Sequence, residues 1–95
     1  GLSVIFFAGL LGFAMVKLGE KEWKASGMLD LYQLELELGM LDLVEDDAGY
    51  ISVSGLILDK MQGYVELGTV LNYQGIQFKV TEMEGNRIKS VHIQA

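Results

Sequence analysis

The segment "YISVSGLILDKMQGYVELGT", residues 50–69, decides the fold because it contains one helix with clear ends and then a change of pattern. Ser52 has a short hydroxyl side chain that can accept hydrogen bonds from the free N–H groups of a first helical turn, so it is predicted to cap the helix. The helix is expected to end at Gln62-Gly63. Between these points apolar residues recur at helical spacing, which predicts one buried stripe: Val53, Leu56, Ile57 and Met61.

Two further expectations concern the same helix. Gly55 lies in its first turn, where glycine costs about 1 kcal/mol of helix stability relative to alanine. Such a cost suggests that another backbone segment approaches closely at Gly55. Asp59 and Lys60 lie off the apolar stripe and are expected to face water.

Beyond Gly68 the apolar residues recur at every second position, which is typical of strands with one buried face. One strand is predicted to begin at Val70 and to turn at Gln74-Gly75, with Gly75 able to adopt positive φ. The next strand divides its residues between two faces: Ile76, Phe78 and Val80 on one, and Gln77, Lys79 and Thr81 on the other.

Residues 83–86, "MEGN", predict a second turn, because Gly85 and Asn86 both tolerate positive φ. In the strand that follows, Ile88 and Val91 are three positions apart, an odd number, so a regular strand would place them on opposite faces. Ile88 can share a face with Val91 and Ile93 only if the strand contains an extra, unpaired residue. We therefore predict a β-bulge near Lys89-Ser90.

A hairpin is predicted at residues 14–26, with its turn at Gly19-Glu20-Lys21 and its end at Gly27. In it, apolar and other side chains alternate: Ala14, Val16 and Leu18 with Phe13, Met15 and Lys17, then Trp23 and Ala25 with Glu22, Lys24 and Ser26.

Residues 28–39, "MLDLYQLELELG", fit both helical spacing and strand alternation. Leu, Glu and Gln favour a helix, and the segment has no β-branched residue. Asp30 with Gln33 resembles a capping arrangement, and Gly39 suits the left-handed position after a helix. We therefore predict a short helix here.

The order of hairpin, helix, helix and three-stranded meander predicts an α+β domain. Its mainly antiparallel sheet should carry the two short helices on one face. The apolar side of the ribbon from Ile76 to Ile93 should be covered by the segment between Ser52 and Met61. Ninety-five residues are enough for one domain, expected at residues 14–95.

Residues 1–13 are expected to form an apolar leader of uncertain origin. The first sixteen residues carry no charge, yet the run is shorter than the roughly 20 residues that span a membrane. It also lacks the basic start of a secretory signal. Two interpretations remain: a buried or swapped segment of the fold, or the remainder of a longer apolar segment.

Composition excludes several classes of function. The chain has no cysteine, so disulfides, thiolate nucleophiles and cysteine-bound metals are excluded. Its net charge is −6, with thirteen acidic residues against seven basic ones. Nucleic acids and anionic membrane surfaces are therefore disfavoured as partners.

Few residues suggest chemistry. The one histidine, His92, has no companion nearby in the sequence and is interpreted as a solvated strand residue. The run Glu45, Asp46 and Asp47 fails the EF-hand spacing, so it is a solvated loop or a weak surface site for a divalent cation. No P-loop, dinucleotide fingerprint or nucleophile elbow is present. We expect no catalytic residue and no metal site.

Five aromatic residues could form either a ligand platform or part of the core, and the core is favoured because each ring buries a large area. They are Trp23, Tyr50, Tyr64, Tyr73 and Phe78.

Taken together, residues 50–93 resemble the transporter-associated domain of the CorC/HlyC family, and the likeness extends over about residues 14–95. That family's pattern is approximately Tyr-x-Thr-Leu-Gly-Gly-Leu-(Val/Ile)-Leu, then Leu-Gly-x-Ile-Pro-x-x-Gly, Gly-x-x-Phe-x-Val and Arg-Ile-x-x-Val-x-Ile. The residues in register are Tyr50, Gly55, Leu56, Ile57, Leu58, Gly68, Gly75, Phe78, Val80, Arg87, Ile88, Val91 and Ile93. Ser52 replaces the usual threonine, Ser54 and Gln62 replace glycines, and Val65 replaces the proline.

The resemblance implies a non-enzymatic accessory domain at the cytoplasmic face of a membrane ion transporter. In that family the module follows a membrane domain and a pair of CBS domains, in proteins associated with magnesium and cobalt efflux and called haemolysin-like. A similar module closes some cation/proton exchangers. The partners would be the other domains of the parent protein.

Two alternatives stay open. Descriptions of the family mention FAD, so a module that binds FAD or an adenine nucleotide is the second hypothesis. The residues themselves predict no cofactor, because the sequence has neither a glycine-rich nest nor a basic cluster for a pyrophosphate. A homodimerisation module is the third hypothesis, since the apolar leader would be a liability in a monomer.

Overall fold

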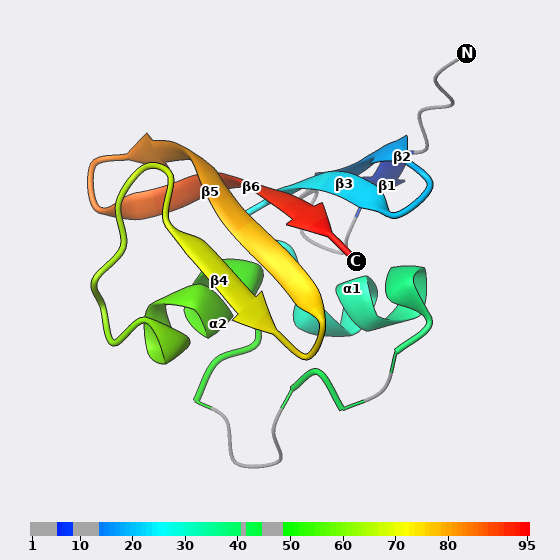
Figure 1. The fold of residues 1–95 in the computed structure, drawn as a ribbon, viewed down its shortest axis with the longest axis horizontal. Helices are drawn as coiled ribbons and strands as arrows, with labels where there is room; N and C mark the ends of the chain where they lie inside the picture. The colour runs from blue at the N-terminus through cyan, green and yellow to red at the C-terminus, as the bar shows by residue number, and fades with distance from the viewer. Residues whose placement is uncertain (1–5, 9–13, 41, 45–48) are drawn as a thin grey trace.

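The computed structural model describes residues 6–8, 14–40, 42–44 and 49–95. These residues form six antiparallel strands in one sheet and two helices, both on the same face of the sheet (Figure 1). The predicted α+β class is thereby confirmed. The elements are β1 (Phe6–Ala8), β2 (Ala14–Gly19), β3 (Glu22–Ser26), α1 (Leu31–Leu38), α2 (Val53–Lys60), β4 (Val70–Tyr73), β5 (Ile76–Glu84) and β6 (Arg87–Gln94).

The sheet has the strand order β1-β2-β3-β6-β5-β4. The hairpin β2–β3 and the meander β4–β5–β6 are each local in sequence, and the pairing of β3 with β6 joins them. The last strand of the chain therefore lies inside the sheet, between β3 and β5.

β1 is a strand that the sequence did not predict. It pairs with β2, so that Phe6 lies opposite Val16 and Ala8 opposite Ala14. The reason for the omission is physical: a run without any polar residue has no alternation, and alternation is the signal that marks a half-buried strand.

The core lies between the helices and the covered face of the sheet, as expected from the segment between Ser52 and Met61. Val53, Leu56 and Ile57 of α2 are fully buried. They share one cluster with buried residues of the strands: Met15, Trp23, Ala25, Ile76, Phe78, Val80, Ile88, Val91 and Ile93. Met61 comes after the last residue of α2 and is only partly buried. Lys60 does not simply face water, because its Nζ lies 5.1 Å from the centre of the Tyr73 ring.

Three helix ends agree with the predicted caps, whereas α2 ends at Lys60 with Met61 as its cap, before the predicted Gln62-Gly63. The Ser52 hydroxyl accepts a hydrogen bond from the Gly55 N–H at 3.1 Å. The Asp30 carboxylate accepts one from the Tyr32 N–H at 2.7 Å, which places the start of α1. Gly39 ends α1 with φ of 67°, a conformation that glycine adopts without steric cost.

The hairpin β2–β3 forms as predicted, and its buried residue on β2 is Met15. Met15 lies opposite Ala25 and faces the helices, whereas Val16 pairs with the exposed Lys24 on the other face. Because nearly every residue of this strand is apolar, the sequence could not indicate which half faces the core.

The predicted bulge is present. Val80 pairs with Val91, Glu82 with Ser90, and Met83 with Ile88, so Lys89 is an extra residue on β6. The same register shows a second extra residue, Thr81 on β5, that was not predicted. With these two residues inserted, Ile88 and Val91 are both buried.

The turns and the close contacts refine the predictions. Gln74 and Gly75 both have positive φ, as does Gly85, whereas Asn86 does not.

At Gly55 the close neighbour is a side chain, because an added Cβ would lie 2.7 Å from the Cβ of Tyr50. The expectation of a second backbone at Gly55 was therefore wrong. A close contact with a second backbone segment does occur at Gly27, where an added Cβ would collide with the Ile88 carbonyl group.

Candidate functional site

The face of the sheet that points away from the helices carries most of the charged side chains of the strands. Its central row consists of Lys24 on β3, His92 on β6 and Lys79 on β5, which lie directly opposite one another in the ladder. Glu22 and Glu82 flank this row and are the candidates for its counter-charges.

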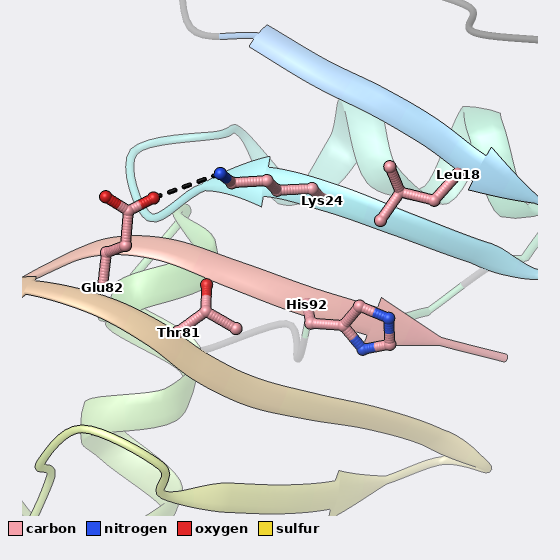
Figure 2. A pocket seen from close by; sticks show the side chains of 5 residues that line it. All are labelled: Leu18, Lys24, Thr81, Glu82 and His92. Atoms are coloured by element: carbon pink, nitrogen blue, oxygen red, sulfur yellow. Dashed lines mark ion pairs between the residues drawn. The ribbon is translucent and has the colours of Figure 1, made fainter.

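Lys24 and Glu82 form an ion pair across the sheet, with 3.2 Å between Nζ and Oε1 (Figure 2). The two residues are on strands β3 and β5, so the Lys24 side chain reaches over β6. The hydrogen bond from Lys24 is the largest of the effects that hold the pKa of the Glu82 carboxyl below its usual range. A hydrogen bond from Ser90 and the charges of Lys24 and Lys89 act in the same direction.

His92 has a companion that sequence reasoning missed. Its Nε2 lies 2.6 Å from Oε1 of Glu22, a residue 70 positions earlier in the chain. The two residues meet because β3 pairs with β6 in a register that makes them diagonal neighbours. His92 is a strand residue on the open face, as interpreted, but the view that it has no companion was wrong, since its side chain is 28% exposed and hydrogen-bonded.

A shallow hollow of about 320 Å³ lies between these groups and is lined by Leu18, Lys24, Thr81, Glu82 and His92 (Figure 2). Within it the basic groups already have acidic partners. Neither pair provides a nucleophile activated by a base. The arrangement can therefore tie the two halves of the sheet together and offer a mixed polar and apolar surface.

A flavin or nucleotide fits this face poorly. A second hollow of about 350 Å³ brings Lys24 and Lys89 together beside Ser26 and Ser90. These are the donors that a phosphate would need. The Glu82 carboxylate already accepts hydrogen bonds from Lys24 and Ser90, and it interacts favourably with the positive charge of Lys89. An incoming phosphate would have to displace it.

The weak metal candidates Glu45, Asp46 and Asp47 lie outside the described residues. Among the residues that the structure describes, no group of three or more histidine and acidic side chains is arranged to hold a metal ion.

The aromatic residues mostly belong to the core, as predicted. Trp23 and Phe78 are buried, and Tyr50 and Tyr73 pack against the core from its edge. Tyr64 is the exception, with 83% of its surface exposed. The five rings therefore do not form one ligand platform.

The motif residues divide into packing, turn and surface positions. Leu56, Phe78, Val80, Ile88 and Val91 meet in the core, while Tyr50 packs beside them. Ser52 caps α2, and Gly68 and Gly75 have positive φ in the loops on either side of β4. Gly55 makes the close contact with Tyr50. Arg87 is exposed at the start of β6 and joins none of these groups.

Comparison with known families agrees with this arrangement. Residues 16–95 match the family model described as CorC_HlyC, transporter associated domain. The chain belongs to the CorC/HlyC transporter-associated domain family. A comparison of this transporter-associated domain with curated proteins gave no significant match.

Solved structures of similar chains share this fold. A conserved domain from Neisseria meningitidis is 34% identical, covers 75% of this chain and 92% of its own, and has a TM-score of 0.68. The transporter-associated domain of a CBS domain protein from Porphyromonas gingivalis is 23% identical, covers 94% of both chains, and has a TM-score of 0.70. The domain of a Xylella fastidiosa haemolysin is 16% identical, covers 94% of this chain and 91% of its own, and has a TM-score of 0.65. The last two likenesses concern the fold alone.

The helices of this transporter-associated domain are short. Neither α1 nor α2, the helices in the described part of the chain, has the length and apolar character that crossing a membrane requires.

Proposed function

We propose that the chain is a non-enzymatic accessory domain of a membrane ion transporter of the magnesium and cobalt efflux or haemolysin-like type. It acts at the cytoplasmic face of the membrane, through contacts with other domains or subunits of its parent protein. The observation that carries this proposal is the family match over residues 16–95.

The geometry of the open sheet face supports a contact function over a catalytic one. Lys24 is paired with Glu82, and His92 with Glu22. Paired groups that connect three strands hold a surface in a fixed shape, which is what a docking domain needs.

Removal of the domain from its parent protein tests the proposal. Residues 16–95 are deleted from the full gene product, and cobalt or magnesium efflux is measured in cells that lack other efflux systems. We expect the shortened protein to reach the membrane with altered assembly or altered ion-dependent transport. Unchanged assembly and transport would contradict the proposal, as would a parent protein without a membrane domain.

Ligand binding is tested separately on the isolated chain. Isothermal titration with FAD, FMN or ATP at millimolar concentration should give no saturable heat, because Glu82 already interacts with Lys24 and Lys89, the two basic groups of the second hollow. A saturable signal that Lys89→Met abolishes would favour the nucleotide-binding alternative.

A second copy of the chain is the remaining partner class. Light scattering over a range of concentrations distinguishes it from contacts with the parent protein. A mass that doubles with concentration would support a homodimer.

A further inference from the structure

The charges of the chain are separated between its two layers. Residues 25–59, which include both helices except for the last residue of α2, contain eight of the thirteen acidic residues and none of the seven basic ones. Five of these eight lie in the described part of the chain: Asp30, Glu35, Glu37, Asp42 and Asp59. Six of the basic residues lie in strands or in the β2–β3 turn. In the described part of the chain, the two helices and the segments beside them therefore carry five acidic residues against one basic residue, Lys60 at the end of α2.

The outer side of α1 is also apolar. Tyr32 is 55% exposed and Leu36 is 76% exposed, although the inward residues Leu31 and Leu34 of the same helix are fully buried. Tyr32 and Leu36 are four positions apart, so they are neighbours on the helix surface. Ile51 is 60% exposed and lies beside the start of α1, where its carbonyl accepts a hydrogen bond from the Leu31 N–H at 2.8 Å.

Acidic residues lie beside this apolar stripe, at the end of α1 where negative charge lowers the stability of a helix. Glu35 and Glu37 lie in the last turn of α1, and no basic residue is present there. The C-terminal end of a helix carries a partial negative charge, so acidic side chains there are unfavourable and basic ones favourable. Glu37 has a structural role, because its carboxylate accepts a hydrogen bond of 3.2 Å from the indole N–H of Trp23. The stability of the domain alone explains neither the exposed Leu36 nor the charge of Glu35.

We propose that α1 is a docking surface for a basic amphipathic segment of a partner protein. The α1 surface comprises Asp30, Tyr32, Glu35, Leu36 and Ile51. Apolar side chains of the partner pack between Tyr32 and Leu36, and its Lys or Arg residues face Asp30 and Glu35. Complementary charge fixes the partner's orientation and speeds its association, while the apolar contact supplies most of the affinity.

This inference deepens the proposed function, on which it rests for the view that the domain acts by contact. Negative charge on the α1 surface disfavours anionic lipid and nucleic acid. A second copy could reach this surface only with its own sheet bases. Such a contact joins two different surfaces and would build rings or open chains of molecules, not a two-fold dimer.

The test uses a probe peptide of about 14 residues made only of Leu and Lys at amphipathic helical spacing, a length at which isolated helices become marginally stable. Binding to the whole chain is measured by fluorescence anisotropy at physiological salt. A peptide of the same pattern with Glu in place of Lys is the charge control. We expect saturable binding of the Lys peptide and none of the Glu peptide.

Matched variants separate the α1 surface from general charge attraction. Leu36→Ser and Glu35→Gln should each weaken binding about fivefold to tenfold, as loss of an interface anchor does. Leu67→Ser and Glu84→Gln change residues outside the α1 surface, of which Leu67 is 66% exposed, and should weaken it less than about twofold. Circular dichroism should show all four variants folded, since each residue is exposed or half-buried.

Three outcomes would overturn the proposal. They are equal effects of Leu36→Ser and Leu67→Ser, absence of binding, and self-association without peptide that Leu36→Ser abolishes. The last result would make a second copy the occupant. Because these measurements need no transporter, they can fail while the deletion of residues 16–95 still alters transport, and the reverse also holds.

Discussion

Gly27 lies directly against the backbone of Ile88, so closely that a side chain on Gly27 would collide with the Ile88 carbonyl group. The Gly27 N–H also donates a hydrogen bond of 3.0 Å to the carbonyl of Lys89, the extra residue of the β6 bulge. Its own carbonyl accepts from the Ser54 N–H at 2.8 Å. One glycine thus connects the hairpin, the bulge and the first turn of α2.

Gly27→Ala should therefore destabilise the domain by about 3 kcal/mol, the upper range for forcing extra atoms into a packed site. The neighbouring atoms belong to the backbone, so they cannot move away as a flexible side chain would. Denaturant unfolding measures the change. Gly49→Ala is the control, because no atom lies within 4 Å of the added Cβ, and it should change stability by less than about 0.5 kcal/mol. Equal effects of the two variants would contradict the contact.

Gly55→Ala tests the contact between α2 and Tyr50 by the sign of its effect. Helix propensity alone predicts a gain of about 1 kcal/mol. We expect a net loss of about 1–2 kcal/mol, because the added Cβ would lie 2.7 Å from the Cβ of Tyr50. A higher free energy of unfolding in this variant would show that the loop at Tyr50 can move aside.

Ser52→Ala should cost about 1 kcal/mol of stability, since it removes the hydroxyl that accepts from the Gly55 N–H. Ser52→Asp should restore most of this loss, because a carboxylate caps the same N–H group and also interacts favourably with the positive end of the helix. Thermal unfolding of the two variants measures both effects. Failure of aspartate to rescue would mean that capping is not the main role of Ser52, whose hydroxyl also lies 3.2 Å from the Ser54 hydroxyl.

Lys24→Met should raise the pKa of Glu82 toward its ordinary value, because the hydrogen bond from Lys24 is the main cause of its depression. A carboxyl whose pKa is lower in the folded state stabilises the fold above the ordinary carboxyl pKa of about 4.3. This stabilisation is lost as the pH falls through the folded-state pKa.

The side-chain carbon shift of Glu82, followed by NMR between neutral and acidic pH, gives this pKa directly. Lys79→Met is the matched control. Lys79 is an exposed lysine like Lys24, it lies on the same strand as Glu82, and it is not among the causes of the lowered Glu82 pKa. Lys24→Met should also flatten the dependence of the free energy of unfolding on pH in the acidic range. A Glu82 pKa that stays depressed in Lys24→Met would assign the shift to Ser90 and Lys89 instead.

Local features of the fold were predictable from the sequence, and distant ones were not. Three helix ends could be predicted from Ser52, Asp30 and Gly39, because capping depends on residues within one turn of the helix end. The spacing of three positions between Ile88 and Val91 predicts the bulge, because side chains of a strand alternate between its two faces and this alternation can be read from neighbouring residues. The pairing of β3 with β6 leaves no such local signal. The His92–Glu22 and Lys24–Glu82 pairs both depend on the order of the strands, and so both were missed.

The position of β6 has a consequence for synthesis of the domain. While a ribosome is still adding residues before Arg87, the hairpin and the β4–β5 pair have no common neighbour, because the strand that joins them has not been made. Pairing between partners so far apart in the chain is slow, since the intervening loop must close first. A nascent chain halted at that stage would expose the unpaired edges of β3 and β5, the type of surface that chaperones cover.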